Sequence, residues 1–84
     1  MNRAEITTLR GIVVASDWDR DGRTTRTAVV TYDEKRCLVV DNETGRELLP
    51  HLKERVVVAG SIGKNKDRMT IDVTAHHIDT EKTA

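Results

Sequence analysis

Two short segments of this chain combine arginine and lysine with residues typical of turns, and this combination can bind phosphate groups. The basic residues are Arg20, Arg23, Arg26, Lys64, Lys66 and Arg68. Lysine and arginine displace the counterions around nucleic-acid phosphates, which gives an affinity that falls as salt rises. The same segments hold four acidic residues, Asp17, Asp19, Asp21 and Asp67. Six basic minus four acidic residues leave a local charge of +2. The alternative is that both segments are ordinary solvated turns.

A protein that binds single-stranded nucleic acid also uses aromatic side chains, because each stacked base contributes roughly 1–3 kcal/mol. Trp18 adjoins the first basic segment, and Tyr32 ends the strand-like run that follows it. We expect both side chains near the bound strand, with Trp18 as the main stacking residue. The alternative for Trp18 is packing across one end of the folded core.

The spacing Asp17-x-Asp19-x-Asp21-Gly22 is similar to the start of a calcium-binding loop. In such a loop alternate carboxylates point at one ion and glycine makes the turn. The twelfth position, which needs a bidentate glutamate, is Ala28 in this chain. A hairpin form would bind calcium weakly, with backbone carbonyls and water completing the shell. The alternative is an Asp-Gly hairpin turn with acidic neighbours that keep it solvated.

Histidine and cysteine give no metal-binding or catalytic pattern. His76 and His77 are adjacent on a strand-like run, so their side chains point to opposite faces. Cys37 is expected to be a small buried apolar residue rather than a nucleophile. Together with His51, these residues match neither a zinc spacing nor a nucleophile–base pair. The sequence therefore predicts no enzyme activity and no cofactor.

The elements that would position these residues follow from hydrophobic periodicity. Runs rich in valine and isoleucine predict strands over 9–17, 25–32, 36–41, 55–62 and 69–78. Leu48, Leu49 and Leu52 stand at helical spacing and predict one short helix within 46–54, which Pro50 limits. Segment 63–68 is expected to be a hairpin loop. The clean alternation of the last strand places Ile71, Val73 and Ala75 inward.

Three strands, one short helix and two further strands within 84 residues are what a five-stranded Greek-key barrel of the OB type requires. The chain also resembles small stand-alone bacterial OB-fold proteins over about residues 9–78. The residues that carry the resemblance are Gly11-Ile12-Val13, Trp18-Asp19-x-Asp21-Gly22, Glu47 to Leu52, and the Val56, Val58, Gly60 series. The fold predicts a ligand on the face of the second and third strands, flanked by the two basic loops. The resemblance implies binding rather than catalysis.

Length and composition limit the remaining possibilities. A chain of 84 residues predicts one domain over 1–84 with flexible termini. The 14 basic and 14 acidic residues balance, so net charge does not favour nucleic acid by itself. One cysteine excludes an intrachain disulfide and fits a reducing compartment. Residues 1–9 lack the apolar core of a secretory signal, and no run of 18 apolar residues predicts a membrane span. We therefore expect a cytoplasmic protein without membrane contact.

The sequence as a whole predicts an all-β binding module that is not an enzyme. Its expected ligand is single-stranded DNA or RNA, bound weakly across the second and third strands and the two hairpin loops. The first alternative is a protein-interaction or adaptor domain, because an edge strand ending at Ile78 could accept a partner strand. The second alternative is calcium binding at the acidic loop.

Overall fold

The predicted β-branched runs form five strands in the structure, a computed structural model that describes residues 6–79. The strands are β1 (Ile6–Trp18), β2 (Thr24–Thr31), β3 (Arg36–Val39), β4 (Arg55–Asn65) and β5 (Arg68–Ile78). Between β3 and β4 lie the α-helix α1 (Glu43–Arg46) and the 3-10 helix η1 (Leu49–His51). The flexible termini expected from the sequence fall mostly on 1–5 and 80–84, which lie outside the described residues, whereas Ile6 to Thr8 belong to β1.

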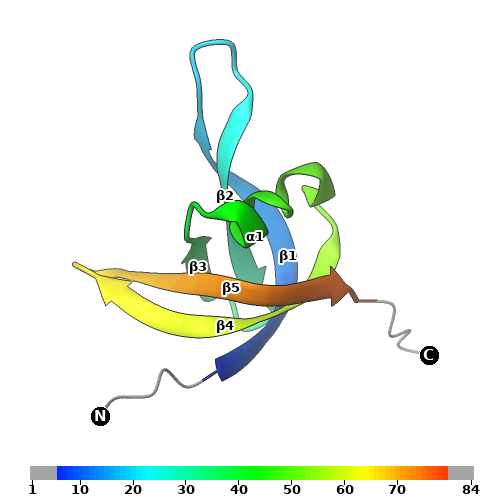
Figure 1. Cartoon of the computed structure of the whole chain (residues 1–84), viewed down its shortest axis with the longest axis vertical. Helices are drawn as coiled ribbons and strands as arrows, with labels where there is room; N and C mark the ends of the chain where they lie inside the picture. The colour runs from blue at the N-terminus through cyan, green and yellow to red at the C-terminus, as the bar shows by residue number, and fades with distance from the viewer. Residues whose placement is uncertain (1–5, 80–84) are drawn as a thin grey trace.

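The strands close into a barrel in the order β1-β2-β3-β5-β4 (Figure 1). The long strand β1 pairs antiparallel with β2 along one edge and with β4 along the other. β3 pairs antiparallel with β2 and parallel with β5. This order, with its short helices between β3 and β4, confirms the predicted all-β class and is consistent with an OB-like fold.

The barrel interior is filled by small branched side chains from every strand and by Leu48 from the helical connection. The core residues are Val13, Val29, Cys37, Val39, Leu48, Val56, Val58, Ile71 and Val73. Their positions alternate along each strand, as expected for a barrel whose outer face is exposed to solvent. The buried set is rich in valine, which fits the narrow interior of a barrel with few strands.

A bulge in β5 changes the predicted alternation. Ala59 pairs with Ala75 and Gly60 pairs with Val73, so Thr74 is an extra residue in the ladder. Beyond this point the side chains of β5 exchange faces, because a one-residue insertion reverses the period of two. Ala75, predicted to point inward, is exposed, and His76 is half-buried instead.

The last two strands are longer than predicted. The loop expected over 63–68 is only a two-residue turn, because β4 continues to Asn65 and β5 begins at Arg68. The ladder continues between Gly63 and Thr70, so cross-strand hydrogen bonding overrides the turn-like composition of this segment. Lys66 accommodates the turn with a left-handed φ of 59°.

The helix expected within 46–54 is replaced by two shorter helices. Asn42 caps α1, since its side chain accepts a hydrogen bond from the Gly45 amide at 2.7 Å. Pro50 stands in the first turn of η1, where its missing amide hydrogen costs nothing. A continuous helix through Pro50 would lose a hydrogen bond and clash with the preceding turn. The connection therefore bends at Glu47 and Leu48.

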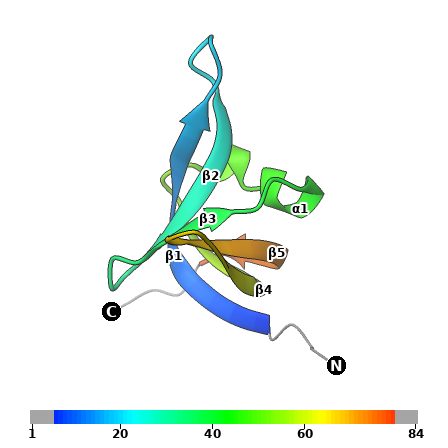
Figure 2. The ribbon, with the colours of Figure 1, turned by 90° about the vertical axis from the view of Figure 1, so that its left-hand side faces the viewer.

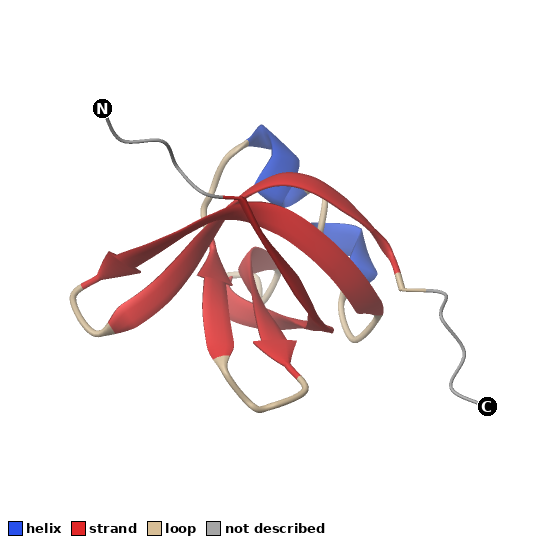
Figure 3. Ribbon diagram, turned by 90° about the horizontal axis from the view of Figure 1, so that it is seen from below, coloured by secondary structure: helices blue, strands red, loops and turns tan. Residues whose placement is uncertain are grey.

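The helical connection covers one flank of the barrel: both helices lie above β5 in Figure 1 and are drawn in blue in Figure 3. Leu48 reaches the core, and polar side chains tie the connection to β5. Asn42 donates a hydrogen bond to the Asp72 carboxylate at 2.6 Å, and Glu47 lies 2.8 Å from Nε2 of His76. β3 is short and pairs with only part of β5. These contacts cover the rest of that edge of β5.

Candidate functional site

A groove of about 600 Å³ lies on the outer surface of the barrel. It spans the end of β1, the start of β3 and the turn between β4 and β5. The residues that line it are Ser16, Asp17, Lys35, Arg36, Leu38, Asp67, Arg68 and Met69. The groove therefore occupies the side of the barrel where an OB-like fold is expected to hold its ligand.

Beside this groove, a row of four paired residues crosses the sheet. Val14 pairs with Ala28, Ala28 with Leu38, and Leu38 with Thr70. Val13, Val29 and Cys37, the sequence neighbours of these residues, point into the core. Successive residues of a strand point to opposite faces of the sheet, so the row itself points outward. Ala28 is fully covered by its neighbours, and Leu38 is half-buried. The accessible apolar surface of this row is therefore limited to Val14 and Leu38.

The groove carries more positive than negative charge. Lys35, Arg36 and Arg68 stand against Asp17 and Asp67, which leaves a local charge of +1. Nζ of Lys35 lies 3.9 Å from the Asp33 carboxylate at the rim of the groove, and both side chains are exposed. The two arginines thus supply most of the unbalanced charge of the groove. Solvent exposure at both side chains leaves them accessible to an anion.

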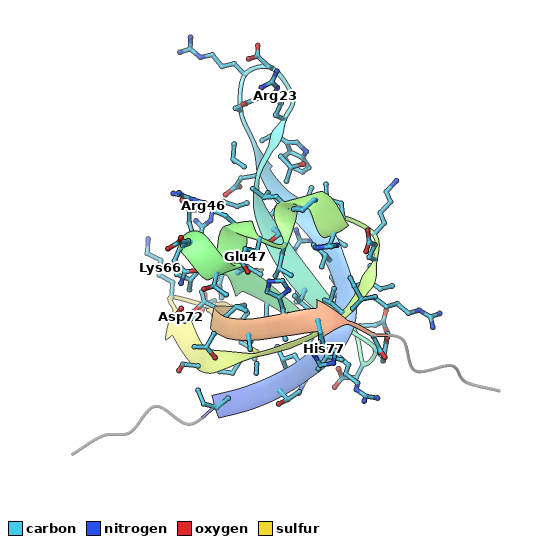
Figure 4. All side chains as sticks on the ribbon, turned by 45° about the vertical axis from the view of Figure 1, so that its right-hand side comes forward. Arg23, Arg46, Glu47, Lys66, Asp72 and His77 are labelled. Atoms are coloured by element: carbon cyan, nitrogen blue, oxygen red, sulfur yellow. The ribbon has the colours of Figure 1, made fainter. Side chains whose placement is uncertain are left out.

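The β1–β2 hairpin extends beyond the barrel as a narrow two-stranded arm (Figures 1 and 2). Arg20 and Arg23 lie in its loop, and Figure 4 shows Arg23 at the tip, well apart from Lys66 of the β4–β5 turn. The sequence predicts that the fold brings the two basic loops together, but in the structure only the residues where the loops join the barrel lie close to one another. Asp17 from the foot of the arm and Arg68 from the other turn line the same groove.

Trp18 stands on this arm, where it pairs with Thr24. Its side chain is 59% exposed, so the alternative that it packs across the end of the barrel does not hold. Trp18 directly follows Asp17, a residue that lines the groove. An exposed indole at this position can stack on a flat ligand group that leaves the groove.

Tyr32 lies far from Trp18. It follows the last residue of β2, whereas Trp18 pairs with the first. Eight residues of extended strand separate the two ends by roughly 25 Å. The Tyr32 hydroxyl donates to the Asp79 carboxylate at 3.4 Å, and the ring is 57% exposed. The two aromatic residues expected beside one bound strand therefore do not form a single stacking surface.

The remaining basic residues predicted from the sequence have separate positions. Arg26 is half-buried, and its Nη2 donates to the Val39 carbonyl oxygen at 3.4 Å, so it bridges β2 and the end of β3. Lys64 is exposed near the end of β4, and Lys66 is exposed in the turn. Of the six, Arg68 alone is in the groove lining. Sequence reasoning missed Ser16, Lys35, Arg36, Leu38 and Met69, because only the parallel β3–β5 pairing brings them together.

The acidic loop is organised by its own backbone. One carboxylate oxygen of Asp19 accepts hydrogen bonds from the Asp21 and Arg23 amides, both at 2.9 Å. Gly22 supplies the left-handed φ of 81° that the turn requires. Within residues 6–79, no three histidine, cysteine, aspartate or glutamate side chains gather as a metal site. The Asp19 carboxylate in this structure therefore serves the turn.

We expect Asp19→Ala to destabilise the hairpin, because two amides lose their acceptor. The loss should be about 1 kcal/mol, since both groups can rebind to water. Thermal unfolding followed by circular dichroism measures it, in EDTA and in millimolar calcium. Asp21→Ala, two residues further along the loop, is the matched control and should have a smaller effect. A calcium-dependent rise in the wild-type Tm that Asp19→Ala abolishes would contradict this role and support an ion site.

Cysteine and histidine lie in structural positions. Cys37 is fully buried, and burial raises the pKa of its thiol above the ordinary value. A buried thiol of raised pKa is a poor nucleophile at neutral pH. His76 contacts Glu47 and His51 contacts Glu54 at 3.1 Å, with the two rings 6.4 Å apart between centroids. These contacts tie the helical connection to β5, and His77 is exposed on the other face.

Comparisons with known protein families, with curated proteins and with solved structures give no significant match. Over residues 6–79, no helix has both the length and the apolar character needed to cross a membrane. The functional conclusion therefore depends on the groove and on the residues around it.

Proposed function

We propose that this barrel is a non-catalytic module that binds single-stranded nucleic acid, DNA or RNA, across the outer face of β2 and β3. The observation that carries the proposal is the groove beside that face, which combines the apolar side chains of Leu38 and Met69 with a net positive charge. Single-stranded nucleic acid combines flat apolar bases with a charged backbone, so it suits a surface with both properties.

In this proposal the backbone of the strand follows the arginines of the groove, and its sugars and bases lie against Leu38 and Val14. A base that leaves the groove past Asp17 stacks on Trp18. Arg20, Arg23, Lys64 and Lys66 are exposed outside the groove and add long-range attraction that salt screens. Stacking and phosphate contact are tolerant of sequence, so we expect little base preference.

An amide chemical-shift titration with a short mixed-sequence oligonucleotide at low salt tests the proposal. Shifts at 16–18, 35–38 and 67–69 that added salt reverses would support it. The absence of shifts at millimolar oligonucleotide would overturn it. The protein-interaction alternative would then be the better account.

Trp18→Ala should weaken oligonucleotide binding by about 5- to 150-fold, because it removes one stacking surface worth roughly 1–3 kcal/mol. Stacking is not screened by salt, so the loss should be similar at low and at physiological ionic strength. The exposed ring contributes little to the core, and the Tm should stay nearly unchanged. Fluorescence anisotropy of a labelled oligonucleotide measures the affinity.

Two further variants control this experiment. Trp18→Phe keeps an aromatic face and should retain most of the affinity. Tyr32→Ala removes an equally exposed aromatic ring at the far end of β2 and should have a smaller effect than Trp18→Ala. Equal losses for Trp18→Ala and Tyr32→Ala would show that the stacking position has been wrongly assigned.

A further inference from the structure

Two arginine side chains stand side by side at the edge of the groove. Arg36 is the first residue of β3 and Arg68 is the first residue of β5, and these strands are parallel. The next residues, Cys37 and Met69, are paired and pack in or against the core. Because strand residues alternate in direction, Arg36 and Arg68 both point outward into the groove.

Among residues 6–79, this arginine pair has no counter-charge in contact with it. Within the described part of the chain, neither guanidinium forms an ion pair or a side-chain hydrogen bond. By contrast, Arg46 is 2.9 Å from the Asp41 carboxylate. Asp17 and Asp67 also line the groove but make no ion pair with either arginine. Like charges on neighbouring strands repel, so the pair is unfavourable until an anion joins it.

We infer that Arg36 and Arg68 form one anion site that clamps a phosphate group of the bound strand, an inference that rests on the proposed function. Guanidinium groups present forked donors that match the oxygens of a phosphate, and two forks can hold one group from both sides. Leu38 and Met69 beside them displace water and strengthen the charge–charge attraction. The main phosphate contact is therefore this pair, and the exposed arginines at the hairpin tip are secondary.

Substitution of each arginine by glutamine tests the clamp, because glutamine keeps much of the side-chain stem and removes the charge. Arg36→Gln and Arg68→Gln should each weaken oligonucleotide binding about 10-fold at low salt. Each should also reduce the slope of log affinity against log salt by about 0.7. Arg23→Gln, the matched control at the hairpin tip, removes the same charge and should weaken binding by less than about 2-fold. Equal losses at all three positions would overturn the clamp.

Two further measurements separate a direct contact from a structural role. If both arginines hold the same phosphate, the double variant should lose less affinity than the product of the single losses. Removal of either charge should also relieve repulsion and raise the Tm of the free protein by about 1–4 °C. A variant that binds weakly because its Tm has fallen would contradict the inference.

Inorganic pyrophosphate, followed by NMR at the Arg Nε–Hε groups, distinguishes this inference from the proposed function. Shifts at Arg36 and Arg68 with pyrophosphate, but none with oligonucleotide, would support the anion site and overturn nucleic-acid binding. Oligonucleotide binding that survives both glutamine variants would support the proposed function and overturn the clamp. The absence of shifts with either probe would overturn both.

Discussion

Gly60→Ala is expected to destabilise the protein by about 3 kcal/mol or more. Gly60 lies in β4 beside β5, and an added Cβ would overlap the carbonyl oxygen of Asp72. It would also lie 2.8 Å from the Asp72 carbonyl carbon and 2.9 Å from the Val73 Cα. All three atoms belong to the backbone of a paired strand, so relief requires movement of the ladder itself.

The expected loss is large relative to the total free energy of unfolding. A domain of this length has an unfolding free energy of about 4–12 kcal/mol, so the substitution would remove a large share of it. Urea unfolding followed by circular dichroism measures the change as a shift of the midpoint. The bulge at Thr74 adds to the constraint, since Gly60 stands at the register shift between β4 and β5.

Gly63→Ala is the matched control for this prediction. It makes the same change three positions further along β4, at an exposed site. The nearest atom to its added Cβ is the Thr70 hydroxyl oxygen at 3.0 Å, which can rotate away. We expect a change within about 0.5 kcal/mol, typical of surface substitutions. A similar loss at both glycines would show that the close strand approach at Gly60 is not the cause.

Leu48→Ala is the second large expected effect, with a loss of about 3 kcal/mol. Leu48 is fully buried and belongs to the core cluster, although it comes from the helical connection rather than from a strand. Its truncation leaves a cavity that the surrounding strands can fill only partly, and Leu→Ala changes at such sites cost about 2–5 kcal/mol. The anchor between this connection and the barrel is lost at the same time.

Leu49→Ala separates burial from chain position in this case. Leu49 is the next residue, is half-buried and lies outside the core cluster. Its truncation should cost about 1 kcal/mol or less. Thermal and urea unfolding of the two variants should therefore differ clearly. If Leu49→Ala were as harmful as Leu48→Ala, helix formation in the connection would explain the stability better than the filled core.

Local patterns predicted much of the fold. The valine-rich runs marked all five strands, since a period of two in a β-branched segment is a property of the segment itself. The Asp21-Gly22 pair marked the hairpin turn, and Pro50 marked a break in the helix, for reasons that act over a few residues. Errors arose where distant strands interact, as at the bulge that exposes Ala75 and at the ladder that extends β4 to Asn65.

The sequence by itself thus determined the all-β class, the order of the elements, the buried positions of Cys37, Ile71 and Val73 and the exposed chemistry of the β1–β2 loop. Only the tertiary structure placed Arg36 beside Arg68 and separated Tyr32 from Trp18. The alternation of apolar and polar residues along a strand predicts which face of the sheet each residue occupies, but not which strand lies beside it. That choice depends on closing the barrel through a parallel pair of strands far apart in the chain, and no local pattern records it.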